Sequence, residues 1–177
     1  MLNGLRLSLS TGQSISADGT TSSTIYLVPH LHGKIELWDG VQWVIYTTNQ
    51  VSVSLGTLVS DKNYDVFAYY DAVVDSIKLE LGAVWFGNGS RTDDDNITPG
   101  IIRFEGVYVK DGDHTRRYLG TFRTISTTTT ADSNSKRFLW NFYNQVDRVL
   151  FITDATNNWT YAGGAGGPNW RGANAST

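Results

Sequence analysis

The sequence predicts an all-β fold, and three observations support this prediction. Apolar and polar residues alternate with period two in many short segments, which is typical of strands with one buried face. Gly, Asn and Asp residues, which favour turns, separate these segments at short intervals. No long segment keeps the 3.6-residue period of a helix. We therefore expect about ten to twelve short strands, arranged as an antiparallel, jelly-roll-like β-sandwich or as a distorted barrel.

The first half of the chain carries the clearest strand signals. Leucines alternate with polar side chains over residues 5–9, as expected of a half-buried strand. Residues 34–38 alternate in the same way and end at Asp39-Gly40, a dipeptide that tolerates the positive φ angles of a hairpin turn. Further strands are predicted over 41–46, 51–55, 64–70 and 77–85.

The second half continues the same pattern after a polar loop that begins at residue 87. One short helical turn fits residues 91–96, and loops are predicted over 111–113 and 127–135. The predicted strands of this half are 101–109, 118–125, 136–143, 148–153 and a short one around 159–161.

Length and composition indicate one domain. The chain has 177 residues, of which 40% are hydrophobic and 12% aromatic, enough to bury a core. We expect a single β domain over residues 1–161 and a Gly-rich tail over residues 162–177. Because the tail contains Trp170, we expect part of it to pack on this domain or on a partner chain.

Composition also excludes several classes of function. The chain has no Cys, which rules out disulfides, thiolate metal sites and a Cys nucleophile. A net charge of −3 argues against a generally basic nucleic-acid-binding protein. No apolar run approaches the length of about 18 residues that a membrane helix needs, so no membrane insertion is expected.

The charges are unevenly distributed along the chain. Residues 1–100 carry an acidic excess and residues 101–177 a basic one. Arg116, Arg117 and Arg123 are the candidate contacts for an anionic partner, because guanidinium groups bind phosphate and carboxylate. The alternative is that they are solvated strand residues paired with nearby acids.

Two groups of residues have the composition of a metal site but not its spacing. His30 and His32 fall on the same face of a strand with two carboxylates, Glu36 and Asp39, nearby in the sequence, but the third histidine, His114, is far along the chain. Asp93, Asp94 and Asp95 form an oxygen-rich cluster that lacks the spacing of a calcium loop. We predict no metal and no cofactor, and the sequence leaves calcium at the aspartates open.

The sequence also predicts no enzymatic activity. Glu36, Glu80 and Glu105 are the candidate carboxylates for a glycosidase, but each occupies an outward position of an alternating strand. No nucleophile elbow or phosphate-binding glycine loop is present.

The six tryptophans are the main candidates for surface contacts. Trp43 and Trp140 lie in dense apolar segments and are predicted to be core residues. Trp159 and Trp170 lie in polar, Gly-rich surroundings. We therefore predict that Trp159, Trp170 and the adjacent Arg171 contact a carbohydrate or a partner chain.

Several stretches together resemble one known family. The clearest is TRRYLGTFRT at 115–124, followed by a threonine run and by KRFLWN at 136–141. Weaker stretches lie at 5–10, 25–29, 35–40 and 63–67. Together they resemble β-rich structural proteins of tailed bacteriophages, described as tail-fibre-like or virion structural proteins.

The resemblance implies a virion location, a homotrimer and contacts with other virion proteins. It leaves open whether the chain is part of a tail fibre, a baseplate or a head decoration. We therefore expect a non-enzymatic virion structural protein, with a host surface glycan as a further partner to be considered. The alternatives are a carbohydrate-binding module that serves in receptor binding and, less favoured, a polysaccharide-degrading enzyme.

Overall fold

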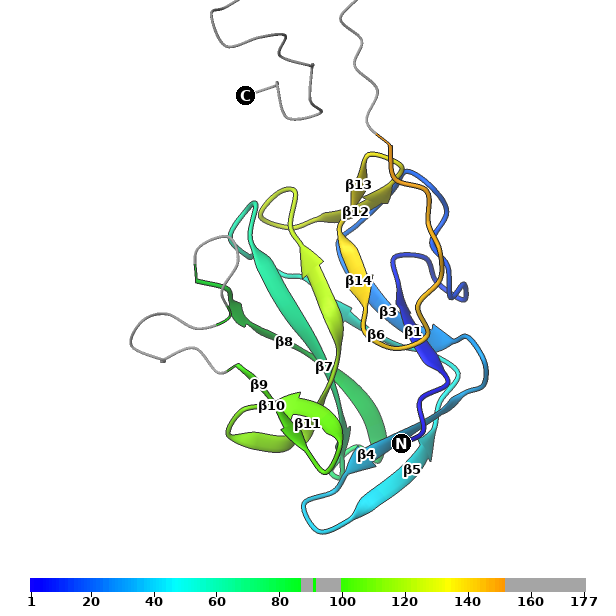
Figure 1. Cartoon of the computed structure of the whole chain (residues 1–177), viewed down its shortest axis with the longest axis vertical. Coiled ribbons are helices and arrows are strands. Elements are labelled where there is room, and N and C mark those ends of the chain that lie inside the picture. Colours follow the sequence, from blue (N-terminus) through cyan, green and yellow to red (C-terminus); the bar gives the residue numbers. More distant parts are fainter. Residues whose placement is uncertain (87–90, 92–99, 152–177) are drawn as a thin grey trace, which may run out of the picture.

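The computed structural model describes residues 1–86, 91 and 100–151, which form an all-β, sandwich-like structure (Figure 1). Within these residues all regular structure is strand, so no helix there could cross a membrane. The predicted all-β class and sandwich-like arrangement are confirmed, and the sheets of this part do not close into a barrel.

The described part of the chain contains fourteen strands, most of them short. In chain order they are β1 (Leu5–Ser8), β2 (Thr20–Ser22), β3 (Thr24–Pro29), β4 (Lys34–Trp38), β5 (Trp43–Thr47), β6 (Val51–Ser54), β7 (Asn63–Asp71), β8 (Ser76–Val84), β9 (Ile101–Phe104), β10 (Val107–Lys110), β11 (Asp113–Arg123), β12 (Thr130–Ser133), β13 (Lys136–Arg137) and β14 (Leu139–Asn141).

Two sheets form the two sides of the sandwich, and all pairings within them are antiparallel. The larger sheet has the order β8-β7-β11-β10-β9, and the smaller one has the order β1-β3-β6. The long strand β11 pairs with β10 along its first part and with β14 along its second part. The β4-β5 hairpin and the small sheet β13-β12-β2 lie at opposite ends of the molecule (Figure 1).

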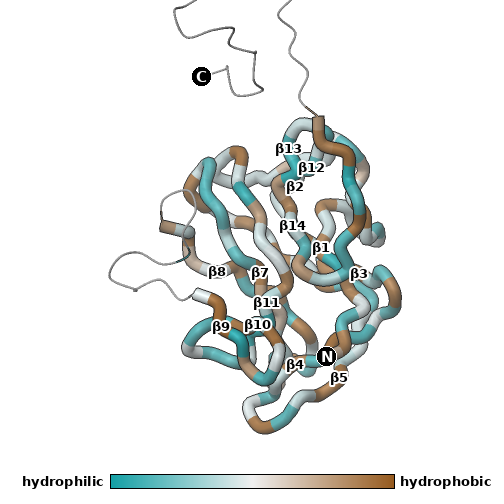
Figure 2. The backbone as a smooth tube through the Cα atoms, in the orientation of Figure 1, coloured by the Kyte–Doolittle hydropathy of each residue, from teal (hydrophilic) through white to brown (hydrophobic). Residues whose placement is uncertain are grey.

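The hydrophobic core lies between these two sheets. Buried side chains of β1, β3 and β4 pack with those of β7, β8 and β11, and the tube in Figure 2 alternates between hydrophobic and hydrophilic along these strands. This period-two pattern is what places one face of each strand in the core. The fully buried members include Leu5, Leu7, Ile25, Ile35, Leu37, Val66 and Phe122.

Strand β1 differs from its prediction because it is buried on both faces. Its leucines face the core as expected, but Arg6 and Ser8 are buried as well. The Ser8 hydroxyl lies 3.2 Å from the Ser16 hydroxyl, and Arg6 Nη1 donates to Ser14 O at 2.5 Å. The loop after β1 therefore covers the face that the alternation pattern would place in water.

Two asparagine side chains complete the outer edge of β1. The Asn141 amide accepts a hydrogen bond from Leu7 N at 2.7 Å and donates one to Leu7 O at 3.0 Å. The Asn144 amide donates to Leu5 O at 2.8 Å and to Asn3 O at 3.0 Å. Backbone groups at a buried edge need partners, and here side-chain amides replace a neighbouring strand.

Strand β14 reaches this position because Gly120 allows it to approach β11 closely. Gly120 pairs with Asn141, and a Cβ at residue 120 would lie 2.1 Å from Trp140 O. Any side chain at residue 120 would therefore displace the strand that carries Asn141.

Two predicted segment boundaries are wrong because of turns. The segment 101–109 is divided by a two-residue hairpin at Glu105 and Gly106, whose φ angles are +46° and +88°. Positive φ at both central residues is the geometry of a tight hairpin turn, although Glu is an unusual residue there. The segment 136–143 is divided into β13 and β14, and the predicted loop 127–135 contains strand β12.

The predicted strand over 148–153 is also wrong within its described residues, since 148–151 form no strand. Their backbone is held by isolated contacts, including Phe151 N to Asn134 O at 2.9 Å. The predicted helical turn over 91–96, apart from Arg91, and the predicted strand at 159–161 lie outside the described residues.

We predict that Asn141→Ala lowers the free energy of unfolding by about 2–3 kcal/mol, because Leu7 N and Leu7 O both lose their partner. Asn141→Asp should lose about half as much, since a carboxylate still accepts from Leu7 N but cannot donate to Leu7 O. Asn49→Ala is the matched control, because Asn49 is exposed. Chemical denaturation followed by circular dichroism measures all three. Equal stabilities for Asn141→Ala and Asn49→Ala would contradict the proposed edge pairing.

Candidate functional site

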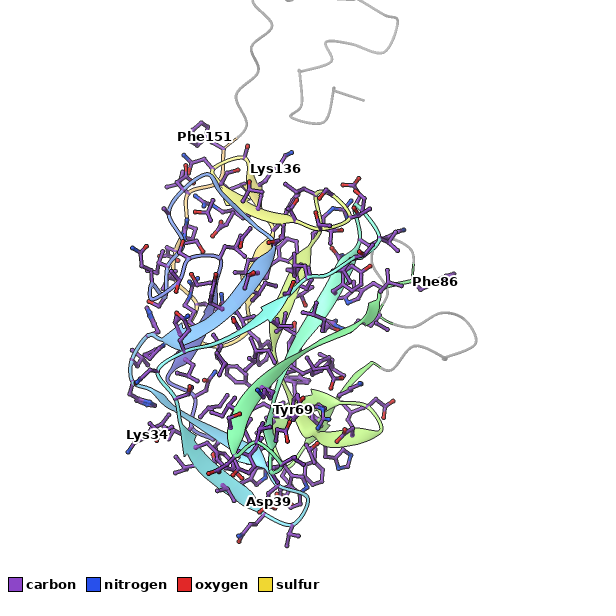
Figure 3. The ribbon with its side chains drawn as sticks, turned by 180° about the vertical axis from the view of Figure 1, so that it is seen from behind. Lys34, Asp39, Tyr69, Phe86, Lys136 and Phe151 are labelled. Atoms are coloured by element: carbon purple, nitrogen blue, oxygen red, sulfur yellow. The ribbon has the colours of Figure 1, made fainter. Side chains whose placement is uncertain are left out.

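The candidate functional site is a pocket with a volume of about 430 Å³. It opens where β14 and residues 145–150 lie against Arg6 of β1, near the end of the molecule that carries Lys136 and Phe151 in Figure 3. Its walls combine charged, amide and apolar side chains. The lining residues are Arg6, Asp132, Arg137, Leu139, Trp140, Asn141, Gln145, Val146, Asp147, Arg148 and Leu150.

Arg137 forms the best-connected wall of this pocket. Its Nη1 donates to Asp132 Oδ1 at 2.8 Å, and its Nε donates to Val149 O at 2.9 Å. Its Nη2 donates to Asn134 Oδ1 at 2.7 Å and lies 3.0 Å from Asp18 Oδ1. Arg137 therefore fixes the backbone of residue 149 beside strand β13 and is fully engaged within the protein.

Asp132 also interacts with two other arginines of the pocket, Arg148 through an ion pair and Arg6 through its charge. Arg148 Nη1 lies 3.5 Å from Asp132 Oδ2, while Arg6 donates only to backbone carbonyls, including Asn144 O at 3.1 Å. Burial of Arg6, and then the positive charge of Arg148, lower the pKa of the Arg6 guanidinium, although Asp132 opposes this effect. Besides Arg137, the pocket thus has two further guanidinium groups, Arg6 and Arg148, and one buried carboxylate, Asp132.

Trp140 supplies an apolar wall, and its position corrects the sequence prediction. It was predicted to be a core residue, but 44% of its surface is exposed. Residues 139–141 form the end of the larger sheet, so the outward position on β14 faces the pocket and solvent. Trp43 is also only partly buried, and its Nε1 donates to Glu105 Oε2 at 2.9 Å.

The structure separates Arg116, Arg117 and Arg123, which the sequence proposed as contacts for an anionic partner. All three lie on β11, but alternation places Arg116 and Arg117 on opposite faces of the sheet. Arg116 Nε donates to Glu80 Oε2 at 2.7 Å, and its guanidinium lies over the Tyr69 ring at 3.8 Å. Arg123 is half-buried near the end of the strand.

Arg117 is an internal residue with no exposed surface. Its Nη1 donates to Leu2 O at 2.9 Å and to Glu36 O at 2.6 Å, and its guanidinium lies 4.7 Å from the centre of the Tyr143 ring. Burial lowers the pKa of Arg117, while Tyr143 and Glu36 raise it. In this arrangement Arg117 joins the chain terminus to the sheet and does not present a surface to a partner.

Several other predicted contacts lie outside the described residues. These are Trp159, Trp170 and Arg171, which were predicted to contact carbohydrate or a partner, and the aspartates Asp93, Asp94 and Asp95.

The described residues hold no group of three or more His, Asp or Glu side chains arranged to bind a metal. His30 Nδ1 lies 2.9 Å from the Ser14 hydroxyl, and His32 lies close to Gly4. His114 stacks on Phe104 with ring centres 4.1 Å apart.

The three glutamates considered for catalysis have separate structural contacts. Glu36 Oε2 accepts from Leu2 N at 2.9 Å, whereas Glu80 pairs with Lys110 and Arg116. Glu105 occupies the β9–β10 turn, where its predicted outward strand position is wrong. The partners of the three carboxylates are Leu2 N, the pair Lys110 and Arg116, and Trp43 Nε1, so each carboxylate has its own set of contacts.

Sequence reasoning did not find the pocket because its residues come from four separate segments. In the sequence, Arg137 and Arg148 fall in the basic second half of the chain, and Arg6 is a polar member of an alternating strand, so no local pattern brings the three together. The one signal in the sequence is the density of Asn, Gln and Arg around an exposed tryptophan over residues 137–148.

Comparison of the chain with protein-family models, curated proteins and solved structures found no match.

We predict that the ion pairs of Glu80 make the protein sensitive to acid. Burial raises the pKa of Glu80, but the hydrogen bonds from Lys110 at 2.5 Å and Arg116 at 2.7 Å outweigh it and lower the pKa below its ordinary 4.5. A carboxyl group whose pKa is lowered by folding stabilises the protein above its unfolded pKa, and this contribution is lost as the pH falls through its folded pKa. The melting temperature should therefore decrease as the pH is lowered below 4.5.

Glu80→Gln tests these ion pairs. Asp111→Asn is its control, because Asp111 is an exposed carboxylate in the turn between β10 and β11, the strands that carry Lys110 and Arg116. Glu80→Gln should be less stable at neutral pH and should lose less stability on acidification than the wild type. A Glu80→Gln protein with the same acid dependence as the wild type and as Asp111→Asn would contradict this account.

Proposed function

We propose that the chain is a non-enzymatic structural protein of a bacteriophage virion that assembles with copies of itself. The support is the family resemblance of residues 115–124 and 136–141, the sandwich-like fold and one exposed apolar surface. The resemblance leaves open whether this part of the virion is a tail fibre, a baseplate or a head decoration.

The observation that carries this proposal is the exposed apolar surface formed by Val149, Leu150 and Phe151. These consecutive side chains are 66%, 62% and 52% exposed. The end of the described chain is strongly hydrophobic in Figure 2, and Phe151 extends from the surface in Figure 3. Such a concentration of large apolar side chains is typical of a protein–protein contact.

The backbone of this apolar surface is held in place although its side chains face water. Arg137 binds Val149 O, and Phe151 N donates to Asn134 O. Ordering a chain segment is entropically unfavourable, and these residues recover little of that free energy by burial. A partner that covers them would recover it.

A second copy of this chain is the partner that we propose for the apolar surface. A trimer is the assembly that the family resemblance implies, and in a closed trimer each copy contacts the next through two different surfaces. Other virion proteins would then attach to the assembled form.

We predict a solution mass of about three times the 19.6 kDa of the chain, measured by size exclusion with light scattering. The double variant Val149→Ser with Phe151→Ser should shift the mass towards one chain, because it removes apolar area from the contact. Val41→Ser is the control, since Val41 is even more exposed, at 81%, but lies at the β4–β5 turn. A wild-type protein that stays a monomer at all concentrations would contradict the proposed self-assembly.

The virion location has its own test. Antibodies against the purified chain should label intact particles of the encoding phage in immunogold electron microscopy. Label that stays with free protein and never with particles would contradict the virion assignment.

A further inference from the structure

The pocket contains a buried cationic nitrogen that the described residues leave without a hydrogen bond. This atom is Arg148 Nη1, which lies 3.5 Å from Asp132 Oδ2 but does not form a hydrogen bond with it. The other oxygen of Asp132 is engaged by Arg137 at 2.8 Å. A buried donor without an acceptor is unfavourable, and a charged one especially so. The pocket is therefore suited to a ligand that brings an acceptor.

The charge around this nitrogen favours an anionic acceptor. Burial, and then the nearby charge of Arg148, lower the pKa of the Arg6 guanidinium, while the buried carboxylate of Asp132 opposes both effects. Asp147 also lines the pocket, but it is exposed, so solvent screens its charge. A carboxylate placed between Arg6 and Arg148 would compensate the second guanidinium group.

The remaining walls are suited to a ring with both apolar and polar edges. The exposed indole of Trp140 and the side chains of Val146 and Leu150 form the apolar part. Gln145 adds an exposed amide that can bind hydroxyl groups. A volume of about 430 Å³ falls in the range of small-molecule sites and accommodates a sugar unit.

We propose that this pocket binds a carboxylate-bearing sugar, such as a hexuronic acid unit of a polysaccharide. Arg148 binds the carboxylate, Trp140 packs against the sugar ring, and Gln145 contacts a hydroxyl group. This inference goes beyond self-assembly, because Arg148, Trp140 and Gln145 lie outside the assembly surface, although Leu150 belongs to both.

The experiment is a titration of the ¹⁵N-labelled protein with sodium glucuronate and with sodium galacturonate, followed by NMR. The Trp140 indole N–H signal, assigned by its loss in Trp140→Phe, should shift and reach saturation with at least one uronate. Glucose lacks the carboxylate, and sodium acetate and inorganic phosphate lack the sugar ring. All three should bind at least about tenfold more weakly, because each lacks part of the recognised structure.

Variants test the assigned roles. Arg148→Gln should weaken uronate binding by about tenfold or more, since it removes a charge-assisted hydrogen bond. Arg148→Lys should bind with intermediate affinity, because it keeps the charge but not the planar guanidinium. Arg103→Gln is the matched control, because Arg103 is exposed on β9 and does not line the pocket.

Three results would overturn the inference. The first is equal binding of glucose and the uronates, and the second is equal binding of phosphate or acetate without a shift of Trp140. The third is unchanged uronate affinity in Arg148→Gln. Light scattering on the same samples separates this inference from the proposed function. A trimer that binds no uronate overturns only the ligand assignment, whereas a monomer that binds uronate overturns only the self-assembly.

Discussion

The amide side chains on the outer edge of β1 are the constraint on which much of this structure depends. Strand β1 is buried on both faces, so its edge groups require hydrogen-bonding partners. Asn141 supplies both partners of Leu7, and Asn144 binds Leu5 O and Asn3 O. This bonding fixes residues 139–148 against the first strand of the chain. The pocket is built on this segment, and the exposed apolar surface of residues 149–151 directly follows it.

Two buried arginines extend the same connection between the beginning and the later part of the chain. Arg6 donates to Asn144 O, and Arg117 donates to Leu2 O and Glu36 O while its guanidinium faces Tyr143. Backbone carbonyls, and not carboxylates, accept most of these hydrogen bonds. Such bonds position chain segments without neutralising the charge, which is why positive charge remains at the pocket. Arg6 therefore both holds residue 144 in place and leaves positive charge at the pocket, where we propose that an anionic ligand binds.

The fold class could be predicted from the sequence because period-two alternation is a local property. Residues 34–38 and the following Asp39-Gly40 turn illustrate this: the hairpin exists, and Asp39 Oδ1 accepts from Val41 N and Gln42 N. The Glu105-Gly106 turn was missed because its first residue carries no turn signal. Alternation also says nothing about what covers the outer face of a strand, so the burial of Arg6 and Ser8 was not predicted.

The candidate site was less accessible to sequence reasoning than the fold, for a physical reason. Trp140 was interpreted as core because its neighbours in sequence are apolar, but burial depends on which sheet lies opposite. Arg6, Asp132, Arg137 and Arg148 meet only after strands far apart in the sequence have paired. The predicted trio on β11 failed to form a surface cluster because adjacent strand residues point to opposite sides of a sheet.

Hydrogen exchange of the Leu7 amide tests the central structural claim most directly. Leu7 N has a side-chain acceptor, Asn141 Oδ1, at 2.7 Å in place of a strand neighbour. If the hydrogen bonds from the asparagine side chains hold the edge of β1, this proton should exchange only through global unfolding, as slowly as the backbone amides of the central strands β7 and β11. Exchange at the rate of an exposed turn amide, such as that of Gly40, would contradict the claim that residues 139–148 are anchored to β1.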